Sequence, residues 1–208
     1  MNIKVCGITE MKQLHQLDGL DIDFAGLIFY KESPRYIGDK LSKKDVKNAD
    51  FDLKKVGVFV DPGMIDVLDA IDDYGLEVVQ LHGDESPEIC GDLSSEVEVI
   101  KAFRVTNGTD IDKMVAPYDG VCDYYLFDTG GLKESFGGTG QQFDWGILSK
   151  AKIEKPFFLS GGIGVEDAAR VKAFRHPDFF GVDINSRFEK SPGVKDMGMV
   201  LAFKQGLK

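Results

Sequence analysis

The sequence predicts an α/β protein, a single compact (β/α)₈ TIM barrel that spans residues 1–208. Eight short segments rich in β-branched and aromatic residues recur along the chain, separated by stretches that leave room for a crossover helix but are too long for hairpin turns. Their apolar runs are continuous, as in strands buried on both faces. No proline- or serine-rich linker divides the chain, so we expect one domain.

The expected strands lie at similar intervals along the chain. They are Ile3–Ile8, Phe24–Phe29, Lys55–Val60, Val78–His82, Val97–Phe103, Tyr124–Asp128, Pro156–Ser160 and Phe179–Ile184. A helix is clearest behind Pro62, where apolar residues recur at the spacing of one helical face. These residues are Met64, Val67, Leu68 and Ile71, and they predict one buried stripe.

Two of the segments that connect the expected strands help to define the fold, the fifth one and the one after the first strand. Segment 107–123 has little apolar periodicity, so we expect a short or irregular fifth helix. An open doubly wound sheet is the alternative to a barrel, but it would normally carry a G-x-G-x-x-G loop after its first strand. Here the first strand is followed by Thr9-Glu10-Met11-Lys12. In a barrel, the carboxyl ends of the strands form one catalytic face.

The amino-acid composition excludes some classes of binding partner. Lys and Arg total 25 against 35 Asp and Glu, and the net charge of −10 argues against a nucleic-acid partner. No apolar run approaches the roughly 20 residues that span a bilayer, and the polar N-terminal segment predicts no signal peptide. Three cysteines suit a reducing cytoplasm. We expect a cytoplasmic protein with a small-molecule ligand, no membrane partner, and a monomer rather than a dimer.

Two strand ends carry candidate acid and base groups. Cys6 ends the first strand in KVCGIT, where it is either a small buried apolar residue or a base whose pKa the site must lower from about 8.5. Asp128 ends the sixth strand in YYLFDT, where it is either a cap or a general acid. Raising its pKa from about 3.9 to about 7 takes about 4 kcal/mol. We expect burial beside Tyr125 and Phe127, or an anionic substrate, to supply that shift.

Other strand ends carry polar residues that suit an anionic ligand. Arg35, behind a rigid Ser-Pro pair, has the planar fork that grips a carboxylate, although it also suits a solvated surface. Gln80 and His82 end the fourth strand, and His82 is either structural or a ligand contact. Lys101 and Arg104 of the fifth strand cannot both face the barrel interior, so at most one belongs to the site.

Glycines after the last strands predict a phosphate site. In (β/α)₈ enzymes the loops after strands seven and eight commonly bind phosphate. Backbone N–H groups at Gly161, Gly162, Asn185 and Ser186 are placed for this purpose, although the glycines also suit simple tight turns. A further glycine-rich segment around Gly138 predicts a flexible loop over the site. The three histidines are scattered, so we expect neither a metal nor a cofactor.

Seven blocks in order carry a resemblance to a known family. They are KVCGIT, SPRYI, VGVFVD, VQLHGDE, FDT followed by GGTG, LSGGI, and INSRFE with PGVKD. The chain resembles the phosphoribosylanthranilate isomerases of tryptophan biosynthesis. The resemblance implies an Amadori rearrangement of N-(5-phosphoribosyl)anthranilate to 1-(2-carboxyphenylamino)-1-deoxyribulose 5-phosphate.

The resemblance also implies roles for the candidate residues. Cys6 would be the general base, Asp128 the general acid and Arg35 the partner of the anthranilate carboxylate. The residues expected around the remaining substrate, including its phosphate, are Gln80, His82, Gly138, Gly161, Gly162, Asn185 and Ser186.

Three other functions are alternatives. Indole-glycerol-phosphate synthase would need a catalytic lysine at the end of strand two or three, and the histidine-pathway isomerase an aspartate in place of Cys6. A non-catalytic barrel that binds a phosphorylated ligand would need neither Cys6 nor Asp128.

Overall fold

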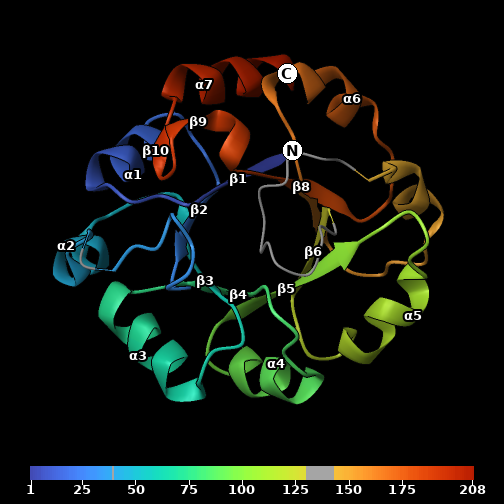
Figure 1. Cartoon of the computed structure of the whole chain (residues 1–208), viewed down its shortest axis with the longest axis horizontal. Coiled ribbons are helices and arrows are strands. Elements are labelled where there is room, and N and C mark those ends of the chain that lie inside the picture. The colour runs from blue at the N-terminus through green and yellow to red at the C-terminus, as the bar shows by residue number, and fades with distance from the viewer. Residues whose placement is uncertain (39, 130–142) are drawn as a thin grey trace.

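A closed barrel of eight parallel strands forms the centre of the molecule, with helices around it (Figure 1). The structure is a computed structural model and describes residues 1–38, 40–129 and 143–208. The strands are β1 (Asn2–Cys6), β2 (Phe24–Ile28), β3 (Lys54–Phe59), β4 (Val78–Leu81), β5 (Glu98–Val105), β6 (Tyr124–Thr129), β7 (Phe157–Leu159) and β8 (Phe179–Ile184). Because β8 pairs with β1, with Lys4 in register with Asp183, the sheet has no open edge. The predicted barrel is confirmed.

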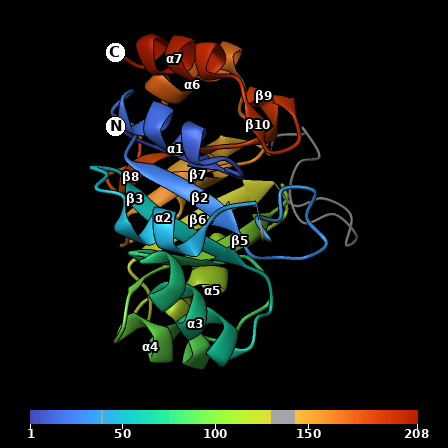
Figure 2. The ribbon, with the colours of Figure 1, turned by 90° about the vertical axis from the view of Figure 1, so that its left-hand side faces the viewer.

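The helices lie outside the strands and cover the barrel on its flanks (Figure 2). They are α1 (Met11–Asp18), α2 (Lys43–Asn48), α3 (Met64–Tyr74), α4 (Pro87–Ser94), α5 (Ile111–Val115), α6 (Ala168–Ala173) and α7 (Met197–Gly206). Four 3₁₀ turns accompany them, η1 (Ala116–Tyr118), η2 (Trp145–Lys150), η3 (Val165–Asp167) and η4 (Ser186–Phe188). The short fifth helix is confirmed. No helix in the described ranges is both long and apolar enough to cross a membrane.

Alternate residues of each strand fill the barrel interior, because successive side chains point to opposite faces of a sheet. Near the amino ends of the strands the interior holds an aromatic plug of Phe24, Tyr124, Phe158 and Phe180. The ring centroids of Phe24 and Phe158 are 5.4 Å apart, and those of Phe158 and Phe180 are 5.2 Å apart, both edge to face. The plug fills this end of the barrel, and the polar interior residues lie towards the carboxyl ends.

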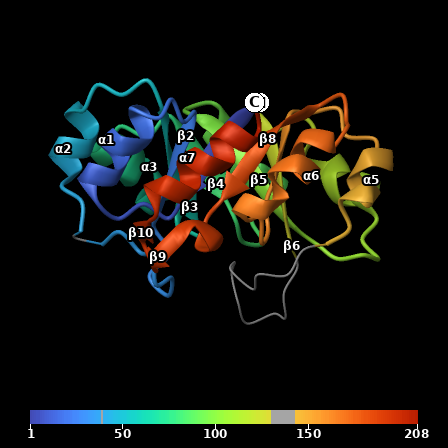
Figure 3. The same ribbon diagram turned by 90° about the horizontal axis from the view of Figure 1, so that it is seen from above.

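A small antiparallel hairpin after β8 is absent from the predicted elements. It consists of β9 (Glu189–Ser191) and β10 (Val194–Lys195), and it lies at the end of the barrel opposite the chain termini (Figure 3). Two side chains near the start of the chain hold its turn. The Thr9 hydroxyl donates to the Gly193 carbonyl at 2.7 Å, and the Gln13 amide donates to the same oxygen at 3.0 Å.

Helix α3 is rotated from the predicted orientation. Its buried residues are Val67, Ala70 and Tyr74, whereas Leu68 is 39% exposed and not part of the buried stripe. The reason is the ring of Tyr74, which packs edge to face on Phe29 with centroids 5.1 Å apart and fixes which face of the helix meets the barrel. The prediction of Leu68 as a core residue was wrong.

The same substitution at two leucines of the outer helices tests the assignment of Leu68 to the exposed face of α3. Leu14 of α1 is fully buried. We expect Leu14→Ala to lower the free energy of unfolding by about 2–5 kcal/mol, because it removes buried methylenes and leaves a cavity. Leu68→Ala should lower it by less than about 1 kcal/mol, since most surface substitutions have small effects. Urea denaturation of both variants measures the difference, and equal losses would contradict the assignment.

Candidate active site

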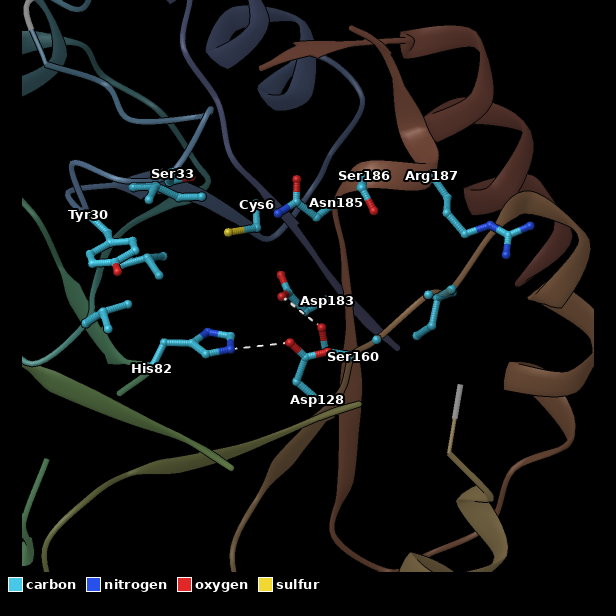
Figure 4. Close-up of a pocket in the computed structure, with 16 residues that line it drawn as sticks. Cys6, Tyr30, Ser33, His82, Asp128, Ser160, Asp183, Asn185, Ser186 and Arg187 are labelled. Carbon is cyan, nitrogen blue, oxygen red and sulfur yellow. Dashed lines mark hydrogen bonds and ion pairs between the residues drawn. The ribbon is translucent and has the colours of Figure 1, made fainter. Parts of the chain in front are cut away.

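A pocket opens at the carboxyl ends of the strands (Figure 4). Seven of the predicted site residues line it, namely Cys6, His82, Asp128, Gly161, Gly162, Asn185 and Ser186. Cys6 lies on one side of the pocket, and the contact between His82 and Asp128 lies across from it, with Asp183 between them. The remaining predicted residues, Gln80, Arg35 and Gly138, do not line this pocket in the part of the chain that the structure describes. Gly138 lies outside the described residues.

Cys6 is the last residue of β1 and is 4% exposed. Its neighbour in register on β2 is Gly26, and a Cβ atom there would lie 2.9 Å from the Cys6 Sγ, so the glycine makes room for the sulfur. Burial raises the pKa of the Cys6 thiol, the ammonium groups of Lys4 and Lys195 lower it, and Asp183 raises it, with a net upward shift. The expectation of a lowered pKa was wrong, because desolvation outweighs the nearby cations.

Asp128 faces the same pocket from β6. Its Oδ1 accepts a hydrogen bond from its neighbour, the Thr129 N–H, at 2.8 Å, and its Oδ2 lies 3.3 Å from His82 Nε2. Tyr125 and Phe127 do not surround the carboxyl group. They belong to the apolar layer between the strands and the helices, because odd and even positions of β6 point to opposite faces. The expected burial of Asp128 between these two rings was therefore wrong.

The orientation of His82 is set by Gln80, which is fully buried inside the barrel. Gln80 Nε2 lies 2.7 Å from His82 Nδ1. An amide nitrogen only donates, so His82 Nδ1 accepts, and the neutral ring carries its proton on Nε2, the atom that faces Asp128. Gln80 Oε1 has no hydrogen-bond partner among the described residues. Gln80 thus acts on Asp128 through His82 and does not contact the pocket itself.

Glycine backbone forms the wall of the pocket next to Asp128. Gly161 and Gly162 follow β7 with φ angles of +88° and +67°, which favour glycine. A Cβ atom at Gly161 would also lie 2.2 Å from Thr129 Oγ1 and 2.8 Å from Asp128 Oδ1, so a side chain there would displace the carboxyl group. Asn185 and Ser186 adjoin this wall where η4 begins.

Arg35 lies above the end of β1, next to the pocket. Gly7, at φ +80°, lets it pass, since a Cβ atom there would lie 2.6 Å from Arg35 Cδ. The guanidinium binds Glu189 through two nitrogens on one edge, Nε to Oε1 at 2.9 Å and Nη2 to Oε2 at 2.7 Å. Glu189 also accepts from Lys195 Nζ at 2.6 Å. Arg35 Nη1 does not take part in these hydrogen bonds to Glu189.

The fifth strand resolves the alternative between Lys101 and Arg104. Lys101 points away from the barrel interior, towards the helices, where its ammonium group binds Glu85 at 2.6 Å and the Gly83 carbonyl at 2.8 Å. Arg104 is on the interior-facing side of the strand, but its guanidinium binds Asp84 at 2.6 Å and does not line the pocket.

Several residues at or beneath the pocket were missed by the sequence reasoning, and four of them are charged or hydrogen-bonded groups of the site. Ser160, Asp183 and Arg187 line the pocket, and Lys4 pairs with Asp183 at 2.8 Å from Nζ to Oδ1. The Ser160 hydroxyl donates to Asp183 Oδ2 at 3.3 Å, and Arg187 pairs with Glu166. Strand alternation was the available signal for two of them, because Lys4 and Cys6, and likewise Phe158 and Ser160, lie two residues apart on the same interior face. Asp183 shares that face because it is in register with Lys4.

Comparison with known proteins agrees with the geometry. The family model of N-(5'-phosphoribosyl)anthranilate isomerase matches residues 3–206 of the chain. The chain belongs to the phosphoribosylanthranilate isomerase family. A relative from Parabacteroides distasonis, N-(5'-phosphoribosyl)anthranilate isomerase, is 41% identical over 99% of this chain and 92% of its own.

Solved structures of phosphoribosylanthranilate isomerases have the same fold. One shows monomers generated from the dimeric enzyme of Thermotoga maritima, with a TM-score of 0.81 and 28% identity over 100% of this chain and 98% of that one. Another holds reduced 1-(o-carboxyphenylamino)-1-deoxyribulose 5-phosphate, with a TM-score of 0.82 and 28% identity at the same coverage. The family and the barrel inferred from the sequence are thereby confirmed.

The tautomer of His82 can be measured directly. We expect ¹⁵N NMR of the wild-type protein, at a pH where the ring is neutral, to show the proton of His82 on Nε2. Gln80→Met removes the donor to Nδ1 at similar volume, so the proton should distribute between the two nitrogens. His15, on the outside of the barrel, serves as the reference ring. An unchanged His82 spectrum in the Gln80→Met variant would contradict the role of Gln80.

Proposed function

We propose that this chain isomerises N-(5-phosphoribosyl)anthranilate to 1-(2-carboxyphenylamino)-1-deoxyribulose 5-phosphate, the activity for which its family is named. The observation that carries the proposal is the placement of Cys6 and Asp128 on two sides of one pocket. An aldose-to-ketose rearrangement needs an acid at the ring oxygen and a base at the neighbouring carbon, and two such groups can serve one sugar in turn.

Asp128 is the proposed general acid. It delivers a proton to the furanose ring oxygen, the bond between C1 and that oxygen breaks, and the lone pair of the anthranilate nitrogen forms a Schiff base at C1. The substrate carries a carboxylate and a phosphate, and negative charge brought into the pocket favours the protonated form of Asp128. His82, oriented by Gln80, holds the carboxyl group in place.

Cys6 is the proposed general base. Its thiolate takes the proton from C2, and the electron pair of that bond forms the C1–C2 double bond while neutralising the Schiff base. The resulting enolamine gains a proton at C1 and loses the proton of its C2 hydroxyl, which gives the aminoketose and returns a proton to Asp128. Cys6 regains its starting form by releasing the proton it took.

The two ends of the substrate need separate anchors. Gly161, Gly162, Asn185 and Ser186 are the proposed phosphate site, and the neighbouring positive φ values at the two glycines support it, since such backbone forms anion-binding concavities. Arg35 is the proposed partner of the anthranilate carboxylate. Its Nη1 is turned away from Glu189, which supports a grip on a second carboxylate.

We also propose a monomer in the reducing cytoplasm. Of the described large apolar residues, Ile65 and Leu68 are exposed three positions apart on α3, and Met1 and Leu201 are exposed on other segments, which supports a chain whose exposed apolar area is confined to small patches. All three cysteines are free and buried, which supports a reducing compartment. The Thermotoga maritima relative differs in being dimeric.

Loss of either proposed acid–base group tests the reaction. We expect Cys6→Ala and Asp128→Asn each to lower kcat by about 10²–10⁴-fold, the usual contribution of a positioned acid or base. The loss of substrate fluorescence measures turnover, and calorimetry with the reduced product analogue should show affinity within a few-fold of wild type. Cys122→Ala, which removes a buried thiol far from the pocket, is the matched control. Binding without turnover in the wild-type chain would instead indicate a phospho-ligand binding barrel.

The carboxylate anchor has its own test. Arg35→Lys keeps the charge but loses the planar fork, so we expect KM to rise by about 10–100-fold, as a hydrogen bond to a charged group of about 1.5–3 kcal/mol is lost. Arg104→Lys makes the same change in an arginine that binds Asp84 outside the pocket, and KM should stay at the wild-type value. A fall in kcat at constant KM in the Arg35 variant would overturn the anchor assignment.

A further inference from the structure

A fully buried lysine stands inside the barrel without a role in the proposed reaction. Lys4 is 0% exposed, and its Nζ pairs with Asp183 Oδ1 at 2.8 Å. Burying two charges costs about as much free energy as their attraction returns, so apolar residues of similar volume are often as stable. Phe24, in register with Lys4 on β2, shows that apolar side chains fill this part of the barrel. Stability alone therefore does not account for the lysine.

The position of Lys4 links it to Cys6. The two residues are two apart on β1, so their side chains point to the same face, the barrel interior. Asp183, in register with Lys4 on β8, lines the pocket together with Cys6. The ion pair of Lys4 and Asp183 thus lies between the aromatic plug and the sulfur, at the base of the pocket.

Charged groups act on Cys6 from three strands. Lys4 lies on its own strand, Asp183 on β8 and Lys195 on β10. Of the two lysines, Lys4 acts more strongly on the thiol. Burial lowers the pKa of Lys195, and its bond to Glu189 does not fully restore it. Burial also lowers the pKa of Lys4, but Asp183 and Cys6 outweigh it, so Lys4 holds its proton firmly.

The other charges around the pocket are engaged with one another. Across the pocket, His82 contacts Asp128 at 3.3 Å. Above the end of β1, Arg35 is bound to Glu189 through two atoms of its fork. Lys4 is also paired, with Asp183, but it lies on the same strand and the same face as Cys6, which makes it the cation best placed to face a negative sulfur.

We propose that Lys4 is a positioning residue that serves as the counter-ion of the Cys6 thiolate. The thiol S–H bond breaks, the sulfur keeps the electron pair, the proton leaves to solvent through the pocket, and Lys4 stays protonated beside the new negative charge. Asp183 holds the ammonium group at the base of the pocket while the thiol is neutral. The inference rests on the proposed role of Cys6 as the base.

The proposal is tested by the pH dependence of Cys6 alkylation with iodoacetamide, without substrate, followed by mass spectrometry of the Cys6 peptide. Burial also raises the pKa of Cys90, to about 11, and that of Cys122, to about 12, and the peptide readout separates their alkylation from that of Cys6. We expect Lys4→Met to move the midpoint upward by at least about one pH unit, which is about a tenfold lower rate below the midpoint. Lys4→Arg, which keeps the charge, should restore most of the rate.

The matched control is Lys101→Met. Lys101 is another lysine in a buried ion pair, with Glu85 at 2.6 Å, but it lies on the outer face of the barrel. Its loss should lower stability without moving the Cys6 midpoint. If Lys4→Met does not fold because Asp183 is left unpaired, the double variant Lys4→Met/Asp183→Asn removes both charges. Its midpoint should still rise, since Lys4 acts on the thiol more strongly than Asp183 does.

Two outcomes separate this inference from the proposed function. A Cys6 midpoint that is the same in wild type and in the folded Lys4 variants would overturn the counter-ion role, whatever the enzyme turns over. A shifted midpoint in a chain that does not consume phosphoribosylanthranilate would leave the counter-ion role standing and overturn the proposed reaction.

Discussion

The structure depends on one constraint, the alternation of side chains along strands that close into a barrel. Every second side chain of a strand points into the barrel interior, and this interior is open only at its two ends. The aromatic plug fills the amino end, so interior residues further along the strands meet at the carboxyl end. This is how Cys6, His82 and Asp128, from three different strands, come to line one pocket. Shifting any of these strands by one residue would turn its polar group towards the helices.

The same constraint explains how a chain with a net charge of −10 can hold an anionic substrate. The charges near the pocket are arranged in close pairs, Lys4 with Asp183 inside the barrel and Arg35 and Lys195 with Glu189 above it. Short-range contacts, not the field of the whole molecule, therefore decide what the pocket binds. The paired cations are held in fixed positions, which suits recognition of a substrate with a carboxylate at one end and a phosphate at the other.

Much of the fold and part of the site could be predicted from the sequence, because both depend on local pattern. Continuous apolar runs mark the strands, and strand ends mark Cys6 and Asp128. The missing parts depend on contacts between distant segments. Lys4 resembles a surface residue until its pairing with Asp183, 179 positions away, is known. The bond of Arg35 to Glu189 joins residues 154 apart, and the net effect of burial on the Cys6 thiol needs the closed barrel.

The central claim is that one substrate lies between Cys6 and Asp128, with its phosphate against the glycine wall. A crystal structure of this chain with reduced 1-(o-carboxyphenylamino)-1-deoxyribulose 5-phosphate tests it most directly. We expect the phosphate at Gly161 and Ser186, the sugar carbons between the thiol and the carboxyl group, and the anthranilate carboxylate towards Arg35. A ligand bound with its phosphate away from Gly161, or with its sugar out of reach of Cys6, would contradict the account.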